Sequence, residues 1–219
     1  MRLTKKPNNQ YTAVVPCASF ALLRQVVKPT SKNPARISRS QFMINDDGNN
    51  KHKTMSLNYL KSSIRQFDYY RQLGEKALLQ LDDAALFYQA HEESNSIAII
   101  VKHLWGNMRS RWTNFLTEDG EKPWRERDTE FEQTEATRAA VMEKWNEGWQ
   151  YLMTTLHELT EADLSKTIYI RQEAHTVLEA INRQIAHYAY HVGQIVFIAK
   201  MRKGAEWQSL SIPRKPIGT

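Results

Sequence analysis

The chain contains little of what would cross-link a small domain or anchor it in a membrane. Its 219 residues include a single cysteine, Cys17, which excludes an intrachain disulfide framework and a cysteine-based zinc cluster. No run of 18 uncharged apolar residues occurs, so the sequence predicts no transmembrane helix. We therefore expect a soluble protein of a reducing compartment, the cytoplasm. The length allows one domain with a real core, or one domain plus a tail.

Acidic residues are scarce in the first quarter of the chain. Residues 1–54 hold ten Lys and Arg but only two acids, Asp46 and Asp47, so this segment carries +8. Because the formal net charge of the whole chain is +6, the remainder carries −2. The basic character therefore belongs to the N-terminal segment, and the remainder lacks the basic excess that is typical of nucleic-acid binders.

Residues 1–54 also lack sustained helical or strand periodicity. We expect them to form a poorly ordered extension that contributes nothing to a functional site. One form of this hypothesis is that translation naturally begins at Met55, because the periodic sequence starts directly after it. An organellar transit peptide is an alternative, since the segment is basic, acid-poor and contains serine. Nucleic-acid binding through this basic segment is a further alternative.

Residues 55–205 are predicted to form one all-α domain, a four-helix bundle, followed by a short tail at 206–219. Apolar residues recur there at steps of three and four, which is typical of amphipathic helices that bury one face. The four patterns cover about 56–81, 96–116, 134–159 and 176–203.

The ends of these patterns carry recognisable signals. Thr176-x-x-Glu179 is a capping box that predicts the start of the fourth helix, and Gly204 is expected to end it. Residues 167–170 alternate in polarity and predict a brief extended segment. The loop between the second and third helices, about 17 residues long, is sufficient to cross the bundle.

His187 and His191 stand four residues apart on the fourth predicted helix. This spacing places both imidazoles on one face, about 6 Å apart at Cβ, so both ring nitrogens can reach one ion at about 2.0–2.1 Å. Two unrelated histidines on a half-buried face are the alternative. The surrounding apolar stripe favours the metal pair, because a buried imidazole needs a partner for each nitrogen. Gln184 or Gln194, one turn away on either side, could serve the second nitrogen.

His103 lies on a largely apolar face of the second predicted helix, beside Ile99, Ile100 and Asn107. A hydrogen-bonded core histidine is one interpretation. The other is a third ligand to the same ion, because three histidines with one position left to water are typical of a catalytic zinc site. His52, His91, His157 and His175 lie in less promising places, and we do not expect them to be ligands.

Two stretches resemble a known family. Asn95–Met108 is similar to the second helix of DinB/YfiT-like proteins, and Ile185–Ile195 is similar to their fourth helix. The resemblance covers about 55–205, and the chain resembles most a bacterial branch of unknown function. It implies a divalent-metal site, zinc or nickel, in which His103 matches the ligand of the second helix and His187 and His191 match the HxxxH of the fourth.

The resemblance also implies a function. Some members of the superfamily transfer low-molecular-weight thiols, so we expect a metal-dependent thiol S-transferase that acts on a small electrophile. A metal-dependent hydrolase and a non-catalytic, stress-related metal-binding or interaction module are the alternatives. No Glu or Asp adjoins the HxxxH, so the motif is not the HExxH of a metalloprotease, and no general base is evident. A homodimer is expected from the family and from the aromatic-rich surface.

One basic cluster follows His103 and continues into the long loop. It could bind a carboxylate or the acidic groups of a thiol cofactor. Because acidic residues are interspersed with it, we predict instead that it is a solvated surface. Its members are Arg109, Arg111, Lys122, Trp124, Arg125 and Arg127.

Overall fold

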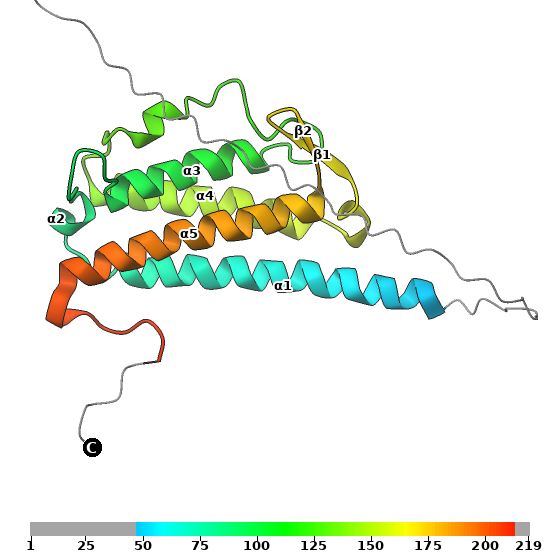
Figure 1. Ribbon diagram of the computed structural model, residues 1–219, viewed down its shortest axis with the longest axis horizontal. Coiled ribbons are helices and arrows are strands. Elements are labelled where there is room, and N and C mark those ends of the chain that lie inside the picture. Colours follow the sequence, from blue (N-terminus) through cyan, green and yellow to red (C-terminus); the bar gives the residue numbers. More distant parts are fainter. Residues whose placement is uncertain (1–46, 213–219) are drawn as a thin grey trace, which may run out of the picture. The chain divides into compact units, whose positions relative to one another are not determined.

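The computed structural model of the chain describes residues 47–212 and is mostly helical, with a small two-stranded sheet (Figure 1). Residues 1–46 and 213–219 lie outside the described residues, and with them most of the expected N-terminal extension and the last part of the expected tail. The four long helices are α1 (Asp47–Leu78), α3 (Ile97–Trp112), α4 (Arg138–Glu158) and α5 (Val177–Lys203). All four predicted helical patterns are therefore helices.

Shorter elements connect them. These are α2 (Asp83–Leu86), the 3₁₀ turns η1 (Asp128–Phe131), η2 (Glu161–Asp163) and η3 (Gly204–Glu206), and the strands β1 (Thr167–Ile170) and β2 (Glu173–Thr176). The extended segment expected at 167–170 is confirmed as β1, but the second strand was not predicted. The expectation of an all-α chain therefore omits a β-hairpin.

Local chemistry explains most of the helix ends. The capping box predicted for α5 is present, because Thr176 Oγ1 accepts from the backbone N–H of Glu179 and the Glu179 side chain accepts from that of Thr176. Gly204 ends α5 with a positive φ of 54°, as expected. In contrast, α3 ends at Trp112, four residues earlier than predicted, because Thr113 is extended and Asn114 has a φ of 49°.

Two turn residues with positive φ, Arg171 and Gln172, join β1 to β2 in an antiparallel hairpin. The carboxylate of Asp119 holds this turn, because it accepts from the backbone N–H groups of both residues. The backbone N–H of Gly120 also donates to the carbonyl of Tyr169. The hairpin is therefore fastened to the segment that follows α3.

The core lies between the four long helices. Helix α1 packs against α4 and α5, and α3 packs against the same two helices. One aromatic residue from each long helix meets at the centre: Phe67, Trp112, Trp149 and Tyr188. All four side chains are at most 1% exposed. Tyr188 Oη donates to Asn107 Oδ1 and accepts from Trp112 Nε1, so the facing sides of α3 and α5 are fixed relative to each other.

Within the described part of the chain, every helix is either too short or too polar to cross a membrane.

Candidate metal centre

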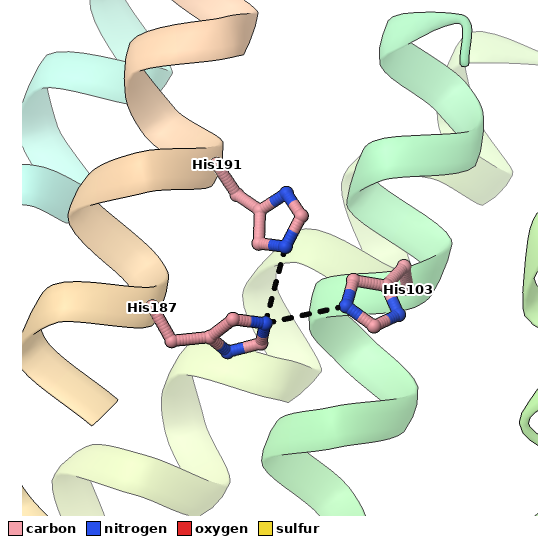
Figure 2. Close-up of side chains that lie close together, drawn as sticks. All are labelled: His103, His187 and His191. Carbon is pink, nitrogen blue, oxygen red and sulfur yellow. Dashed lines mark hydrogen bonds between the residues drawn. The ribbon is translucent and has the colours of Figure 1, made fainter. Parts of the chain in front are cut away.

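The three histidines singled out in the sequence come together on two facing helices (Figure 2). His103 lies on α3, and His187 and His191 lie on α5. His187 Nε2 is 3.3 Å from His103 Nε2 and 3.1 Å from His191 Nε2. All three ligand atoms lie within 4.8 Å of one another, which is close enough to hold one metal ion.

The α5 pair owes its position to helix spacing and to the core beside it. His187 and His191 are one turn apart, so their rings project from the same face. Tyr188, the neighbour of His187, is fully buried and hydrogen-bonded to Asn107 on α3. That bond fixes the rotation of α5 about its axis, and it therefore fixes the direction in which the histidine pair points.

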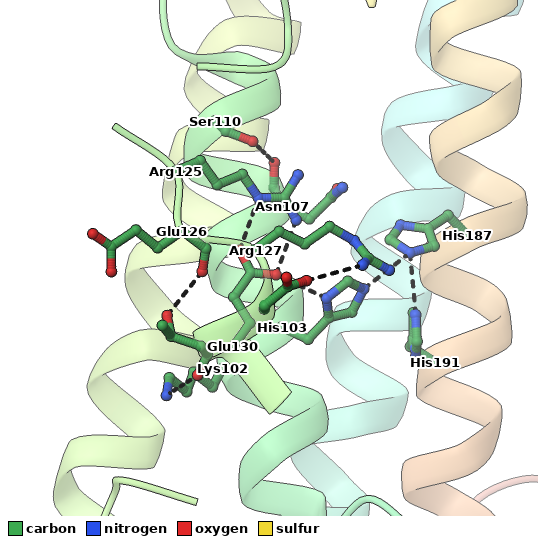
Figure 3. A network of polar contacts seen from close by, with 12 residues as sticks. Lys102, His103, Asn107, Ser110, Arg125, Glu126, Arg127, Glu130, His187 and His191 are labelled. Atoms are coloured by element: carbon green, nitrogen blue, oxygen red, sulfur yellow. Dashed lines mark hydrogen bonds and ion pairs between the residues drawn. The ribbon is translucent and has the colours of Figure 1, made fainter. Parts of the chain in front are cut away.

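His103 is held by a buried chain of charges. Its Nδ1 is 2.9 Å from Glu130 Oε2, and both side chains are less than a tenth exposed. Arg125 donates to both oxygens of the same carboxylate, at 2.8 Å from Nε and 2.9 Å from Nη2. Figure 3 shows Glu130 between Arg125 and His103, with His187 and His191 across on α5. Because a carboxylate only accepts, the proton lies on Nδ1, and Nε2 of the neutral ring keeps its lone pair for a ligand.

Glu130 was not predicted from the sequence, and the structure shows how the loop delivers it. The residue lies in η1, within the long segment that covers α3. Lys102, buried on α3, donates to the carbonyls of Thr129 and Glu132 on either side of it. Gly106 makes the room: a Cβ at this position would overlap the Glu130 carboxylate.

The δ-nitrogens of the two histidines on α5 have different surroundings from that of His103. His191 Nδ1 is 2.8 Å from Gln194 Oε1, and the amide of Gln194 is oriented by donating to Tyr190 Oη. Gln194 therefore serves the second nitrogen of one candidate ligand, as the sequence suggested. Gln184 does not: its Oε1 is buried without a hydrogen-bond partner among the described residues. His187 Nδ1 is likewise buried without a partner in that part of the chain.

Burial and mutual proximity keep the α5 pair uncharged. The pKa of His187 is lowered to about 3, mainly by burial and then by the charges of His191, His103, Arg111 and Arg125 in that order. The pKa of His191 is lowered to about 4, mainly by burial and then by His103, while the hydrogen bond with Gln194 acts in the opposite direction. Neutral imidazoles are the form that binds metals.

Glu130 is ionised despite its burial. Burial raises its pKa, but the hydrogen bonds from His103 and Arg125 and the charge of Arg125 outweigh that effect, so the pKa lies below the ordinary value. The carboxylate is therefore a fixed negative charge behind His103.

The donor set fits a divalent transition metal. Two nitrogens that bind one ion tetrahedrally at about 2.0–2.1 Å are about 3.3 Å apart, close to the two separations seen here. The three Nε2 atoms face one another, and there are too few ring protons to make a hydrogen bond for each of them. At least one nitrogen is therefore left without a good partner, and a bound cation would provide one. His91, His157 and His175 are not part of this group or of any other within the described residues.

The prediction that the basic cluster is a solvated surface is wrong for half of its members. Arg111 and Lys122 are buried, and the side chain of Arg125 is 3% exposed. Arg125 supports the site through Glu130. Trp124 is 47% exposed and stacks with Arg109, which agrees with the prediction for that part.

Fold and site together define a mostly helical protein with a three-histidine group that could hold a divalent metal. The chain belongs to the family described as Protein of unknown function (DUF1572), which matches residues 54–216. No curated protein and no solved structure matches the chain. Because the family description assigns no activity, the function has to be argued from the site.

Proposed function

We propose that the protein binds one divalent metal ion through His103, His187 and His191. The observation that carries this proposal is the convergence of three ε-nitrogens from two helices on one point. Acceptors behind His103 and His191 support it, since they place the ring protons on the far side of the rings. The low pKa values of His187 and His191 support it too, because no proton has to be displaced at neutral pH.

Zinc or nickel is the metal that this donor set favours, since imidazole suits both. The bound ion would keep its full charge, because all three ligands are neutral, and would act as a Lewis acid that lowers the pKa of a coordinated thiol or water. The ionised Glu130 strengthens His103 as a ligand and fixes its ring.

The DinB/YfiT-like fold, a four-helix bundle, is part of the proposal. Each long helix packs against two of the other three, as the four corners of a bundle would. The sequence resemblance at Asn95–Met108 and Ile185–Ile195 falls on the two helices that carry the histidines.

For the reaction we propose transfer of a low-molecular-weight thiol to a small electrophile in the cytoplasm. The thiol is a separate molecule, because the single cysteine, Cys17, precedes the part of the chain that matches the family. Hydrolysis is the less favoured alternative. It requires a free general base, whereas Glu130, the carboxylate hydrogen-bonded to His103, is already held by Arg125.

A homodimer is proposed from the outer face of α5. Tyr190, Phe197 and Met201 are each more than half exposed, and their spacing of seven and four residues puts them on one face. Burial of such a face against a second copy would remove apolar surface from water. Light scattering of the purified protein at several concentrations measures the oligomeric state, and a monomer throughout would contradict this part.

Metal analysis tests the core of the proposal. Wild-type protein is expected to purify with, or take up, about one equivalent of zinc or nickel, and His187→Ala is expected to lose it. His157→Ala, which alters an exposed histidine on α4, is the matched control and should keep the metal. Equal stoichiometric metal in wild type and His187→Ala would overturn the site.

A second assay separates an enzyme from a non-catalytic metal-binding module. Loss of a thiol such as glutathione, cysteine or another bacterial thiol is followed in the presence of chlorodinitrobenzene. The metal-loaded wild type should exceed both the uncatalysed rate and the rate with His187→Ala. Stoichiometric metal without any rate above background would leave the metal-binding module as the function.

A further inference from the structure

Arg111 is a buried charge without a hydrogen-bond or ion-pair partner among the described residues. The residue lies two turns after His103 on α3 and is 3% exposed. It makes no hydrogen bond or ion pair with any residue that the structure describes, and its Nε and Nη1 are both shielded from solvent. A guanidinium stays protonated in proteins, and a buried charge is strongly destabilising unless it is paired. The position therefore favours an anion beside the guanidinium.

The nearby acids are engaged elsewhere. Asp119 accepts from the backbone N–H groups of Glu121, Arg171 and Gln172. Glu121 forms ion pairs with Arg125 and Arg171. The atoms that cover the guanidinium at Nη1 belong to the turn at Gly120, where a Cβ would overlap Arg111. The turn at Gly120 therefore lies against Nη1, while Asp119 and Glu121 act on Arg111 through their charges without a hydrogen bond or ion pair to it.

Arg111 and the three histidines lie along the line where α3 and α5 face each other, which we call the seam. His103 contacts His187 and His191, whereas Tyr188, one residue after His187, reaches Asn107 and Trp112, so α3 and α5 run antiparallel here.

Along this seam, the α3 series His103, Asn107, Arg111 faces the α5 series His191, His187, Arg183. Successive members are one turn apart, about 6 Å along each axis. Arg183 is exposed and lies close enough for its charge to act on Arg111. Burial lowers the Arg111 pKa most, Tyr188 and Glu121 raise it, and Arg125 and then Arg183 lower it further. Two arginines therefore follow the histidines, one buried and one at the surface.

We propose that Arg111, with Arg183 at the surface, forms a carboxylate-binding subsite beside the three-histidine group, and that the small substrate is an organic acid. Guanidinium groups bind carboxylates through paired, charge-assisted hydrogen bonds. The link between this subsite and a reaction rests on the proposed metal-dependent function, whereas carboxylate binding itself does not.

The test uses the full chain loaded with zinc, and succinate as the probe. Calorimetric titration and thermal melting are expected to show that succinate binds and raises Tm, while its uncharged diamide does neither. Arg111→Met should weaken succinate binding at least tenfold, and its Tm without ligand should equal or exceed that of wild type, because a buried unpaired charge has been removed. Arg109→Met, on the same helix but stacked on Trp105 and Trp124, is the control and should bind succinate normally.

Arg183→Met provides a second variant whose exposed position does not endanger folding, and it should weaken succinate binding severalfold. Unchanged binding in both Arg111→Met and Arg183→Met would overturn the subsite. Binding of inorganic phosphate but not of succinate would overturn its assignment to carboxylates. If the wild type holds zinc but no succinate, the subsite alone fails. If it holds succinate but no zinc, only the proposed metal function fails.

Discussion

The three histidines are held in two different ways, and the difference separates α3 from α5. On α3, His103 is hydrogen-bonded to a buried ionised carboxylate, that of Glu130. Glu130 lies in the long segment after α3, and Arg125 donates to both of its oxygens. On α5, His191 has only a neutral amide behind it, and His187 Nδ1 has no partner among the described residues. One side of the site depends on tertiary structure, and the other depends mainly on the one-turn spacing of a helix.

Two glycines, one on each side, should separate these effects most sharply. Gly106→Ala introduces a Cβ that overlaps Glu130, so the carboxylate must leave His103. We expect a loss of about 1–3 kcal/mol in unfolding free energy together with weaker metal binding. Gly193→Ala on α5 meets nothing within 4 Å and should stabilise the protein by up to about 1 kcal/mol. Urea denaturation and competition with a chromophoric chelator measure both quantities.

One result would contradict the expected difference between the two glycine variants. If Gly106→Ala binds metal as tightly as Gly193→Ala does, the contact between Glu130 and His103 is irrelevant to the site. The α3 side would then be no more dependent on the loop than the α5 side.

Glu130→Gln keeps the shape of the side chain and removes its charge. The metal affinity should fall about 10–100-fold, since carboxylates behind a histidine ligand orient the ring and raise its basicity. Glu132→Gln, an exposed change two residues away, is the control and should bind as wild type does. Chelator competition at constant pH gives the ratio, and equal affinities for the two variants would argue against a role for Glu130.

The metal-free protein should lose stability in acid through the α5 side. The pKa values of His187 and His191 are lowered to about 3 and 4, against an ordinary value of 6.5. Between these limits the unfolded chain binds more protons than the folded one, so stability is fully present above pH 6.5 and falls as the pH drops toward 4. Melting curves of metal-free wild type and His187→Ala, recorded from pH 7.5 to 4.5, should show the steeper loss in the wild type.

The smallest effect is expected at Gln194. Gln194→Leu removes the acceptor behind His191 but leaves the helical spacing of the pair intact. We expect metal affinity to fall less than tenfold, because a neutral amide contributes less to a ligand than an ionised carboxylate does. A larger loss than that of Glu130→Gln in the same competition assay would reverse the ranking of the two sides.

The α5 side is also the side that the sequence predicts well. The one-turn spacing of His187 and His191, the capping box at Thr176 and the stop at Gly204 are all local signals, and the structure places each as expected. His103 could be proposed from its apolar helix face and from the family resemblance. Gln194 followed from its position one turn beyond His191.

The α3 side could not be predicted from local patterns. Glu130 lies in a polar, aperiodic segment, and no spacing rule connects it with His103, which is 27 residues earlier. Lys102 donates to that segment and Gly106 leaves room for it, but in the sequence both look like ordinary helix residues. Acidic neighbours in the sequence make Arg111 and Arg125 look solvated. In the fold Arg125 is buried between Glu130 and Glu121, and Asp119 accepts from the hairpin turn instead of from Arg111.

The close fit between Gly106 and the Glu130 carboxylate also constrains how this site can change over evolutionary time. A side chain at position 106 is compatible only with a shorter residue, or a displaced loop, at position 130. Neither substitution alone preserves the contact with His103, so the two positions are expected to vary jointly across relatives, although 24 residues separate them. A member of the family with alanine or serine at the first position should hold its α3 histidine by other means.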